Sequence, residues 1–116
     1  MMGNNTPWNV RWTAGALEDT VEIIQYILKN DGVESARELS DLLKTDVKRQ
    51  LTTFPYRGHV VPELYDTGQE CKEIHIKAYR IIYQPAENGR MVWILLVAHG
   101  KRNILDMLLK RMLHYL

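Results

Sequence analysis

The stretch from Ala78 to Arg102 constrains the fold of this chain more than any other. It contains two runs with the composition of β-strands, Tyr79–Tyr83 and Met91–Ala98, separated by the polar segment Glu87–Arg90. β-Branched and aromatic residues favour a pleated, half-buried surface, and a short polar segment with a glycine favours a turn. The second run is almost wholly apolar, which is typical of a strand covered on both faces. The stretch therefore predicts a β-hairpin whose second strand lies inside a sheet.

Charged side chains lie within and directly after this hairpin. Arg80 is inside the first strand, and His99, Lys101 and Arg102 follow the end of the second. These positions can approach one another in an antiparallel hairpin. We therefore expect them to meet at the edge of one concave face, which is the candidate functional site.

A strand and two helices are predicted before the hairpin. Trp8–Trp12 alternates apolar and polar residues, as a half-buried strand does, and Thr13 can cap the helix that follows. Gly32 is a stop signal for that helix, a second helix begins near Val33, and Pro55 ends it. The expected apolar stripe of the first helix is Leu17, Val21, Ile24 and Leu28, with Ile23 and Ile27 beside it, and that of the second is Ala36, Leu39, Leu43, Val47 and Leu51. The short link predicts an antiparallel helical hairpin.

Two further strands and a third helix complete the prediction. Val60–Leu64 can form a short strand, which Pro62 restricts to an edge or an end, and Lys72–Lys77 alternates as a strand does. Asn103 can cap a C-terminal helix whose apolar residues outnumber those that one buried face needs. We expect the surplus to contact a partner protein or a second copy of the chain, through Met107, Leu113 and Leu116.

The predicted fold class is α+β: an antiparallel meander sheet packed against an N-terminal helical hairpin, with a C-terminal helix. A chain of 116 residues forms one domain, residues 1–116, in which residues 1–7 are a flexible lead-in.

The net charge of +1 excludes a generally basic, nucleic-acid-binding surface. Cys71, the single cysteine, excludes an internal disulfide, and with no signal peptide or membrane-spanning run the expected location is the cytoplasm. The histidines and the cysteine lack metal-binding spacing, so no metal or other cofactor is expected.

The order of these segments resembles the RelE/ParE superfamily of toxins from bacterial toxin–antitoxin modules. The matching pieces, in chain order, are Ala16–Asp19 through Tyr26–Ile27, Phe54–Pro55 with Gly58, Val61–Leu64, Lys72–Ile74, Tyr79–Tyr83 and Val97–Arg102. The resemblance covers roughly Val10 to Leu105. It implies a small toxin that is neutralised by an antitoxin encoded beside it.

The superfamily divides by target, and the resemblance implies two alternatives. Similarity to the ParE-like branch, to which the Phe54–Leu64 segment and the residues from His99 to Arg102 are closer, implies inhibition of DNA gyrase without catalysis. Similarity to the RelE-like branch implies ribosome-dependent cleavage of messenger RNA. An inactive protein that only binds its antitoxin is a third hypothesis.

The nuclease alternative has its own candidate residues. Cleavage of RNA by a 2′-hydroxyl needs an acid, a base and cations that hold the phosphate. By resemblance these are Arg80, Arg102, His99, His75 and Lys77. The tyrosine that RelE-like toxins carry after the second arginine is absent, and Leu108 lies near that position. For the gyrase alternative, near-neutral charge is compatible with a protein target, and Lys101 joins the partner-binding residues.

Overall fold

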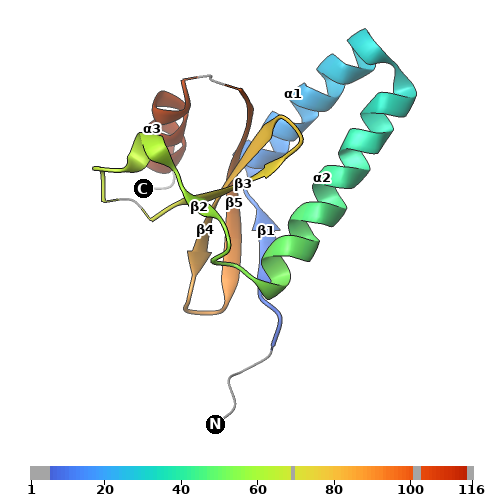
Figure 1. Cartoon of the computed structure of the whole chain (residues 1–116). Coiled ribbons are helices and arrows are strands. Elements are labelled where there is room, and N and C mark those ends of the chain that lie inside the picture. The colour runs from blue at the N-terminus through green and yellow to red at the C-terminus, as the bar shows by residue number, and fades with distance from the viewer. Residues whose placement is uncertain (1–5, 69, 101–102, 115–116) are drawn as a thin grey trace.

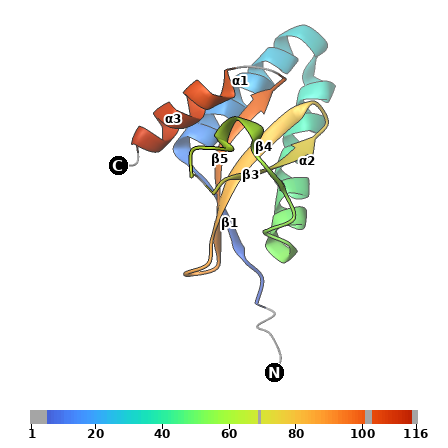
Figure 2. The ribbon, with the colours of Figure 1, turned by 60° about the vertical axis from the view of Figure 1, so that its left-hand side comes forward.

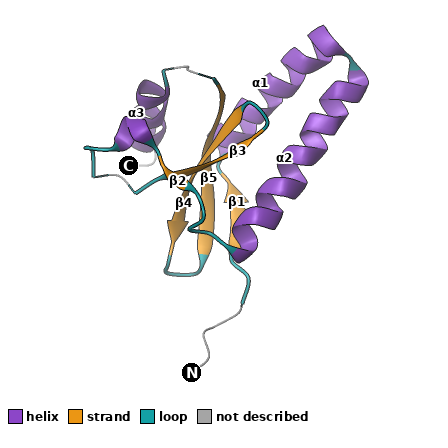
Figure 3. Ribbon diagram, in the orientation of Figure 1, coloured by secondary structure: helices purple, strands orange, loops and turns teal. Residues whose placement is uncertain are grey.

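The computed structural model describes residues 6–68, 70–100 and 103–114. Its elements are β1 (Asn9–Trp12), α1 (Ala14–Asp31), α2 (Val33–Thr53), β2 (His59–Val60), the 3-10 turn η1 (Pro62–Leu64), β3 (Lys72–Ile76), β4 (Tyr79–Ala86), β5 (Met91–His99) and α3 (Ile104–His114). The α+β class and the predicted helical hairpin, central β-hairpin and C-terminal helix are confirmed. Figure 3 shows the sheet lying between the helices.

The strands form one sheet in the order β1-β5-β4-β3-β2. The predicted antiparallel meander covers β2 to β5, and β5 is an interior strand, as expected. The sheet is not wholly antiparallel, because β1 lies parallel to β5, from Asn9 beside Met91 to Trp12 beside Ile94. A parallel neighbour needs a long crossover, which the helical hairpin and the intervening strands provide.

Helices cover both faces of the sheet (Figures 1 and 2). The α1–α2 hairpin covers one face, and its core residues include Leu43, Val47, Leu51, Ile81, Tyr83, Ile94 and Val97. α3 and η1 cover part of the other face, where Val61, Leu64, Ile82, Leu96, Ala98, Ile104 and Leu108 are buried together. We call these the hairpin face and the α3 face.

The helix-capping predictions are confirmed. The Thr13 hydroxyl accepts a hydrogen bond from the Ala16 amide at 3.2 Å and donates one to the Ile94 carbonyl at 2.9 Å, which joins the start of α1 to the sheet. Gly32 ends α1 with φ of 98°, a conformation that favours glycine. The Asn103 side chain accepts a hydrogen bond from the Asp106 amide at 3.2 Å at the start of α3.

Two local expectations were wrong. Pro62–Leu64 is a helical turn and only His59–Val60 is a strand, because proline has no amide to pair but suits the first position of a helical turn. In α1, Leu17, Val21 and Leu28 are about half exposed, whereas Ala16 is buried and Ile23, Ile24 and Ile27 pack on the core. The helix is thus rotated relative to the predicted stripe, since it projects beyond the sheet and packs on α2 and β5 (Figure 1).

A β-bulge interrupts the β4–β5 ladder. Ile82 lies opposite Leu96 and Tyr83 lies opposite Ile94, so Leu95 has no partner on β4. The extra residue brings Leu95 and Leu96 together into the core of the α3 face. The bulge thus provides the apolar surface on which α3 packs.

Candidate functional site

Arg80 lies on the α3 face of β4, at the centre of a cluster of ion pairs. Its Nη1 and Nη2 atoms donate to the two carboxylate oxygens of Glu63, both at 2.8 Å. Its Nε and Nη2 atoms donate to the two carboxylate oxygens of Glu73, at 2.9 and 2.7 Å. The guanidinium therefore makes two bidentate pairs, and its side chain is only 14% exposed. It is committed to intramolecular carboxylates that connect β3, β4 and η1.

The charges of this cluster stabilise one another. The hydrogen bonds from Arg80 lower the pKa of Glu63 below its usual value. Burial by itself raises the pKa of Glu73, but the hydrogen bonds from Arg80 and His75 outweigh burial and the net shift is downward. Hydrogen bonds to Glu63 and then Glu73 raise the pKa of Arg80. All three groups are therefore held in their charged forms.

His75 and Lys77 lie at the outer side of this cluster. His75 is opposite Arg80 on β3, its side chain is 61% exposed, and its Nε2 atom is 2.6 Å from the Glu73 carboxylate. Lys77 is in the two-residue turn between β3 and β4, with φ of 55°. The structure thus places His75 and Arg80 side by side on one face of the sheet.

His99 lies on the opposite face of the sheet. It pairs with Tyr79, its ring centroid is 5.2 Å from the Tyr79 ring, and Tyr79 packs on the hairpin face. Arg80, the next residue of β4, points to the α3 face, since successive side chains of a strand alternate. The expectation that Arg80 and His99 converge on one concave face was therefore wrong. Lys101 and Arg102 lie outside the described residues.

The predicted partner-binding residues of α3 differ in exposure. Met107 is half-buried and packs on the core of the α3 face, whereas Leu113 is 66% exposed. Leu105 and Leu109 are also exposed and share the i, i+4, i+8 spacing with Leu113, so the three form an apolar ridge that sequence reasoning only partly identified. Leu116 lies outside the described residues.

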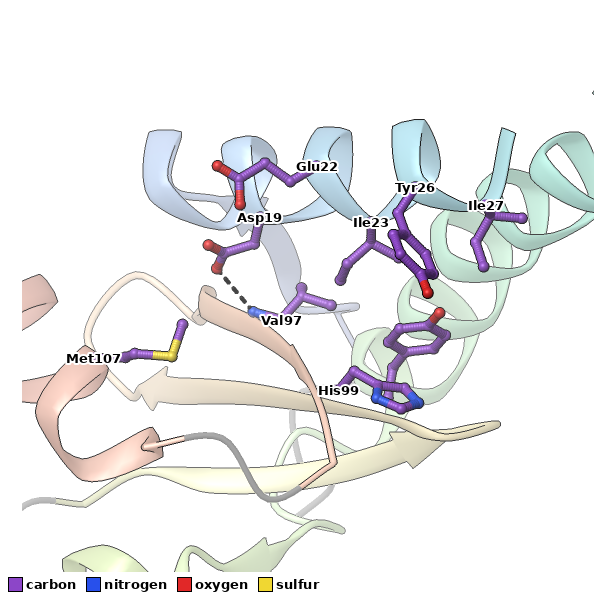
Figure 4. Close-up of a pocket in the computed structure, with 9 residues that line it drawn as sticks. Asp19, Glu22, Ile23, Tyr26, Ile27, Val97, His99 and Met107 are labelled. Atoms are coloured by element: carbon purple, nitrogen blue, oxygen red, sulfur yellow. Dashed lines mark hydrogen bonds between the residues drawn. The ribbon is translucent and has the colours of Figure 1, made fainter. Parts of the chain in front are cut away.

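A second ion pair, which sequence reasoning missed, joins α3 to α1. Arg111 donates to the two carboxylate oxygens of Asp19 at 3.0 and 3.1 Å, and to the Leu95 carbonyl at 2.5 Å. Asp19 also accepts a hydrogen bond from the Val97 amide at 3.0 Å (Figure 4). The arginine lies against Gly15, where a Cβ atom would be 2.5 Å from its Nε. Asp19 and Arg111 are 92 residues apart, so no local pattern could reveal the pair.

A cavity of about 490 Å³ lies beside this ion pair, between α1, the end of β5 and α3. We call it the edge pocket. Its apolar and aromatic walls are Ile23, Tyr26, Ile27, Tyr79 and Met107. Asp19, Glu22, Val97 and His99 complete the lining. In Figure 4, Ile23, Tyr26 and Ile27 extend from α1 toward the strand that carries Val97 and His99.

Residues 10–104 match the profile of the ParE toxin of the type II toxin–antitoxin system parDE. This match covers most of the chain. The chain belongs to the ParE toxin family. A search among curated proteins finds no match for this ParE-family toxin.

Solved structures of ParE and RelE toxins share the fold of the ParE-family chain. A chain of the chromosomal ParDE system from P. aeruginosa is 15% identical, with a TM-score of 0.65, and the match covers 84% of this chain and 100% of that one. The RelBE2 toxin–antitoxin complex from Mycobacterium tuberculosis gives 23% identity, a TM-score of 0.53 and coverages of 81% and 99%. A mutant of the E. coli toxin RelE in the free state is 14% identical, with a TM-score of 0.56, and the match covers 95% of this chain and 99% of that one. These identities support the fold alone.

The part of the chain that the structure describes has neither a cluster of metal-binding side chains nor a helix that could span a membrane. No group of three or more His, Cys, Asp or Glu side chains is placed to hold a metal ion there. Within the same residues, no helix combines the length and hydropathy needed to cross a bilayer. Burial raises the pKa of Cys71 to about 11, so its thiol is unreactive at neutral pH.

Proposed function

We propose that this type II toxin arrests bacterial growth by binding DNA gyrase in the cytoplasm, without catalysis, and that an antitoxin encoded beside it relieves the arrest. Membership of the ParE family and the resemblance of the sequence to the ParE-like branch support this proposal. The net charge of +1 supports a protein surface as the target, since docking on ribosomal RNA is favoured by a strong basic excess.

The pairing of Arg80 with two carboxylates favours a protein target over RNA. Four of the hydrogen bonds available to the Arg80 guanidinium go to Glu63 and Glu73. A phosphate could replace neither carboxylate without leaving buried Glu73 or half-buried Glu63 unpaired. His99, the other residue proposed for catalysis next to Arg80 in the hairpin, lies on the opposite face.

Purified toxin and DNA gyrase test this proposal. We expect ATP-dependent supercoiling of a relaxed plasmid to fall as toxin is added and to recover when the antitoxin is present. His75→Gln is the matched control, because it changes an exposed nuclease candidate and should inhibit gyrase as well as the wild type does. Toxicity in cells together with undiminished supercoiling would contradict the proposal, and absence of any growth effect would favour an inactive antitoxin-binding protein.

A ribosome-dependent nuclease is the second candidate, and the placement of His75 supports it. His75 is exposed on the same face as Arg80, and Lys77 follows in the adjoining turn. An imidazole can act as the general acid or base that RNA cleavage needs. On this hypothesis His75, Lys77, Arg80 and Arg102 serve catalysis as the RelE resemblance implies, and His99, on the opposite face of the sheet from Arg80, takes no part.

Primer extension on translated messages distinguishes the two candidates. The nuclease predicts cuts within codons in cells that produce the wild-type toxin, and loss of those cuts with His75→Gln. The gyrase proposal predicts no toxin-dependent cuts for either protein. The measurement does not depend on Arg80, whose replacement would also destabilise the folded protein.

A further inference from the structure

α3 and η1 leave part of the α3 face of the sheet uncovered, nearest the turn between β4 and β5. The buried core on this face includes Leu95 and Leu96, at and beyond the bulge of β5, but no residue of that strand before the bulge. In Figures 1 and 2 the β4–β5 turn extends well away from α3. The strand segments nearest this turn therefore pack on the hairpin core with one face and leave the other face open.

Trp93 lies at the centre of this open part. Its neighbours Val92 and Ile94 are buried in the core of the hairpin face, so the indole points to the α3 face, where Trp93 is 39% exposed. Trp93 pairs with Arg11 of β1 on one side and with Gln84 of β4 on the other. Because directly paired residues point to the same side of a sheet, the three side chains form a row across it.

A second row, closer to the turn, completes this surface. Asn9 pairs with Met91, and Met91 pairs with Ala86, all on the same side of the sheet as Trp93. We call the two rows together the Trp93 patch, which consists of Asn9, Arg11, Gln84, Ala86, Met91 and Trp93. It contains one cation and no carboxylate.

Three polar groups of the patch have no partner among the described residues. No hydrogen bond or ion pair there involves the guanidinium of Arg11, the side-chain amide of Gln84 or the indole N–H of Trp93. The guanidinium groups of Arg80 and Arg111, in contrast, are held by carboxylates. Guanidinium and indole groups can only donate hydrogen bonds. The patch therefore presents free donors and one positive charge around an apolar centre.

The composition of the patch is typical of the centre of a protein–protein interface. Trp, Met and Arg are enriched at such interfaces, and the patch contains none of the Lys, Glu and Asp residues that are depleted there. A nucleic acid is a poorer fit, since binding to a phosphate backbone uses several cations and the patch has only Arg11. The free donors and the positive charge instead match a carboxylate on a protein partner.

We propose that the Trp93 patch is the surface through which the toxin binds DNA gyrase. The indole of Trp93 packs on an apolar surface of gyrase, and Arg11 pairs with a gyrase carboxylate beside it. Trp and Arg are among the side chains that most often dominate binding free energy at interfaces. Trp93 lies on a strand that is paired on both sides, so little conformational freedom is lost on binding. The inference rests on the proposed function in taking gyrase as the partner.

The experiment compares variants of the full toxin by the concentration that half-inhibits supercoiling by purified gyrase. Trp93→Ala removes the indole, and Arg11→Glu reverses the charge of an exposed side chain that has no partner in the folded chain among the described residues. Tyr65→Ala and Arg37→Glu are the matched controls outside the patch, because Tyr65 is 77% exposed and the Arg37 side chain is 62% exposed. Thermal unfolding shows whether each variant is folded, and Arg11→Glu decides the test if Trp93→Ala is not.

We expect Trp93→Ala and Arg11→Glu each to raise the half-inhibiting concentration at least about tenfold, and the controls to change it by less than about twofold. If the wild type inhibits gyrase and the patch variants inhibit it as well as their controls do, this inference is overturned and the proposed function stands. If the wild type leaves supercoiling unchanged, the proposed function fails and the inference fails with it.

Two further measurements on the same variants identify a different occupant of the patch. We expect both patch variants to bind the product of the open reading frame adjacent to the toxin gene within about twofold of the wild type. A loss of that binding of about tenfold or more would assign the patch to the antitoxin and overturn the inference. Weaker binding to a single-stranded oligonucleotide, with gyrase inhibition unchanged, would assign it to a nucleic acid and also overturn the inference.

Discussion

Replacing Arg80 by methionine tests whether the Arg80 cluster is structural. The substitution keeps an apolar stem but removes the guanidinium, and it leaves the Glu73 carboxylate, with a side chain 5% exposed, without its main partner. Breaking a buried ion pair from one side costs about 3–5 kcal/mol. Glu63 is 31% exposed and His75 still contacts Glu73, so we expect the lower limit, about 3 kcal/mol.

Urea unfolding measures this loss. With a dependence of about 2 kcal/mol per molar urea, the midpoint of Arg80→Met should fall by about 1.5 M. Arg37→Met is the matched control, because Arg37 is 62% exposed and its nitrogen is 3.8 Å from Glu34. An exposed pair of this kind contributes less than about 1 kcal/mol. Equal midpoints for the two variants would refute the structural role of Arg80.

The difference in stability between the wild type and Arg80→Met is expected to depend on pH. The pKa values of Glu63 and Glu73 lie below 4.5 in the folded protein, so their stabilising effect is complete above that pH and is lost as pH falls through the folded values. In Arg80→Met, Glu73 is buried without its cation, which raises its pKa. Acid therefore protonates Glu73 and removes the cost of burying an unpaired carboxylate. The difference in unfolding free energy between wild type and variant should therefore shrink from about pH 7 to about pH 4. A constant difference would contradict this reasoning.

Three further substitutions have expected costs that urea unfolding can check. Gly58→Ala should destabilise the fold by about 1–3 kcal/mol, because the new Cβ would lie 2.5 Å from the Tyr83 hydroxyl; an unchanged midpoint would contradict the close packing. Thr13→Val should cost about 1–2 kcal/mol through loss of the α1 cap, and Thr13→Ser should retain most of the stability. Arg111→Met should cost about 3 kcal/mol by leaving Asp19 unpaired, and should speed hydrogen exchange in α3; unaltered exchange would argue against its role in docking that helix.

Much of the fold could be predicted because its signals are local. The alternation and composition of Tyr79–Tyr83 and Met91–Ala98 specify strands, Thr13 and Asn103 cap helices through their own side chains, and Gly32 permits the positive φ at the end of α1. Each signal acts over a few residues, so it can be read without knowing where the rest of the chain lies.

The candidate site was predicted less well, because side-chain direction depends on register. Arg80 and His99 are near each other along the hairpin, but pairing of His99 with Tyr79 places them on opposite faces. A shift of one residue would have reversed that outcome. The bulge at Leu95 and the rotation of α1 likewise depend on how helices pack on the sheet, which no local pattern records.

The sequence by itself determined which segments become helices and strands, because capping, turn chemistry and hydrophobic periodicity are properties of neighbouring residues. Only the tertiary structure decided that Arg80 is held by Glu63 and Glu73, and that Asp19 and Arg111 bind the backbone of β5. These contacts join residues up to 92 positions apart. The free energy of a charged group depends on which other charges the folded chain brings within a few ångströms of it.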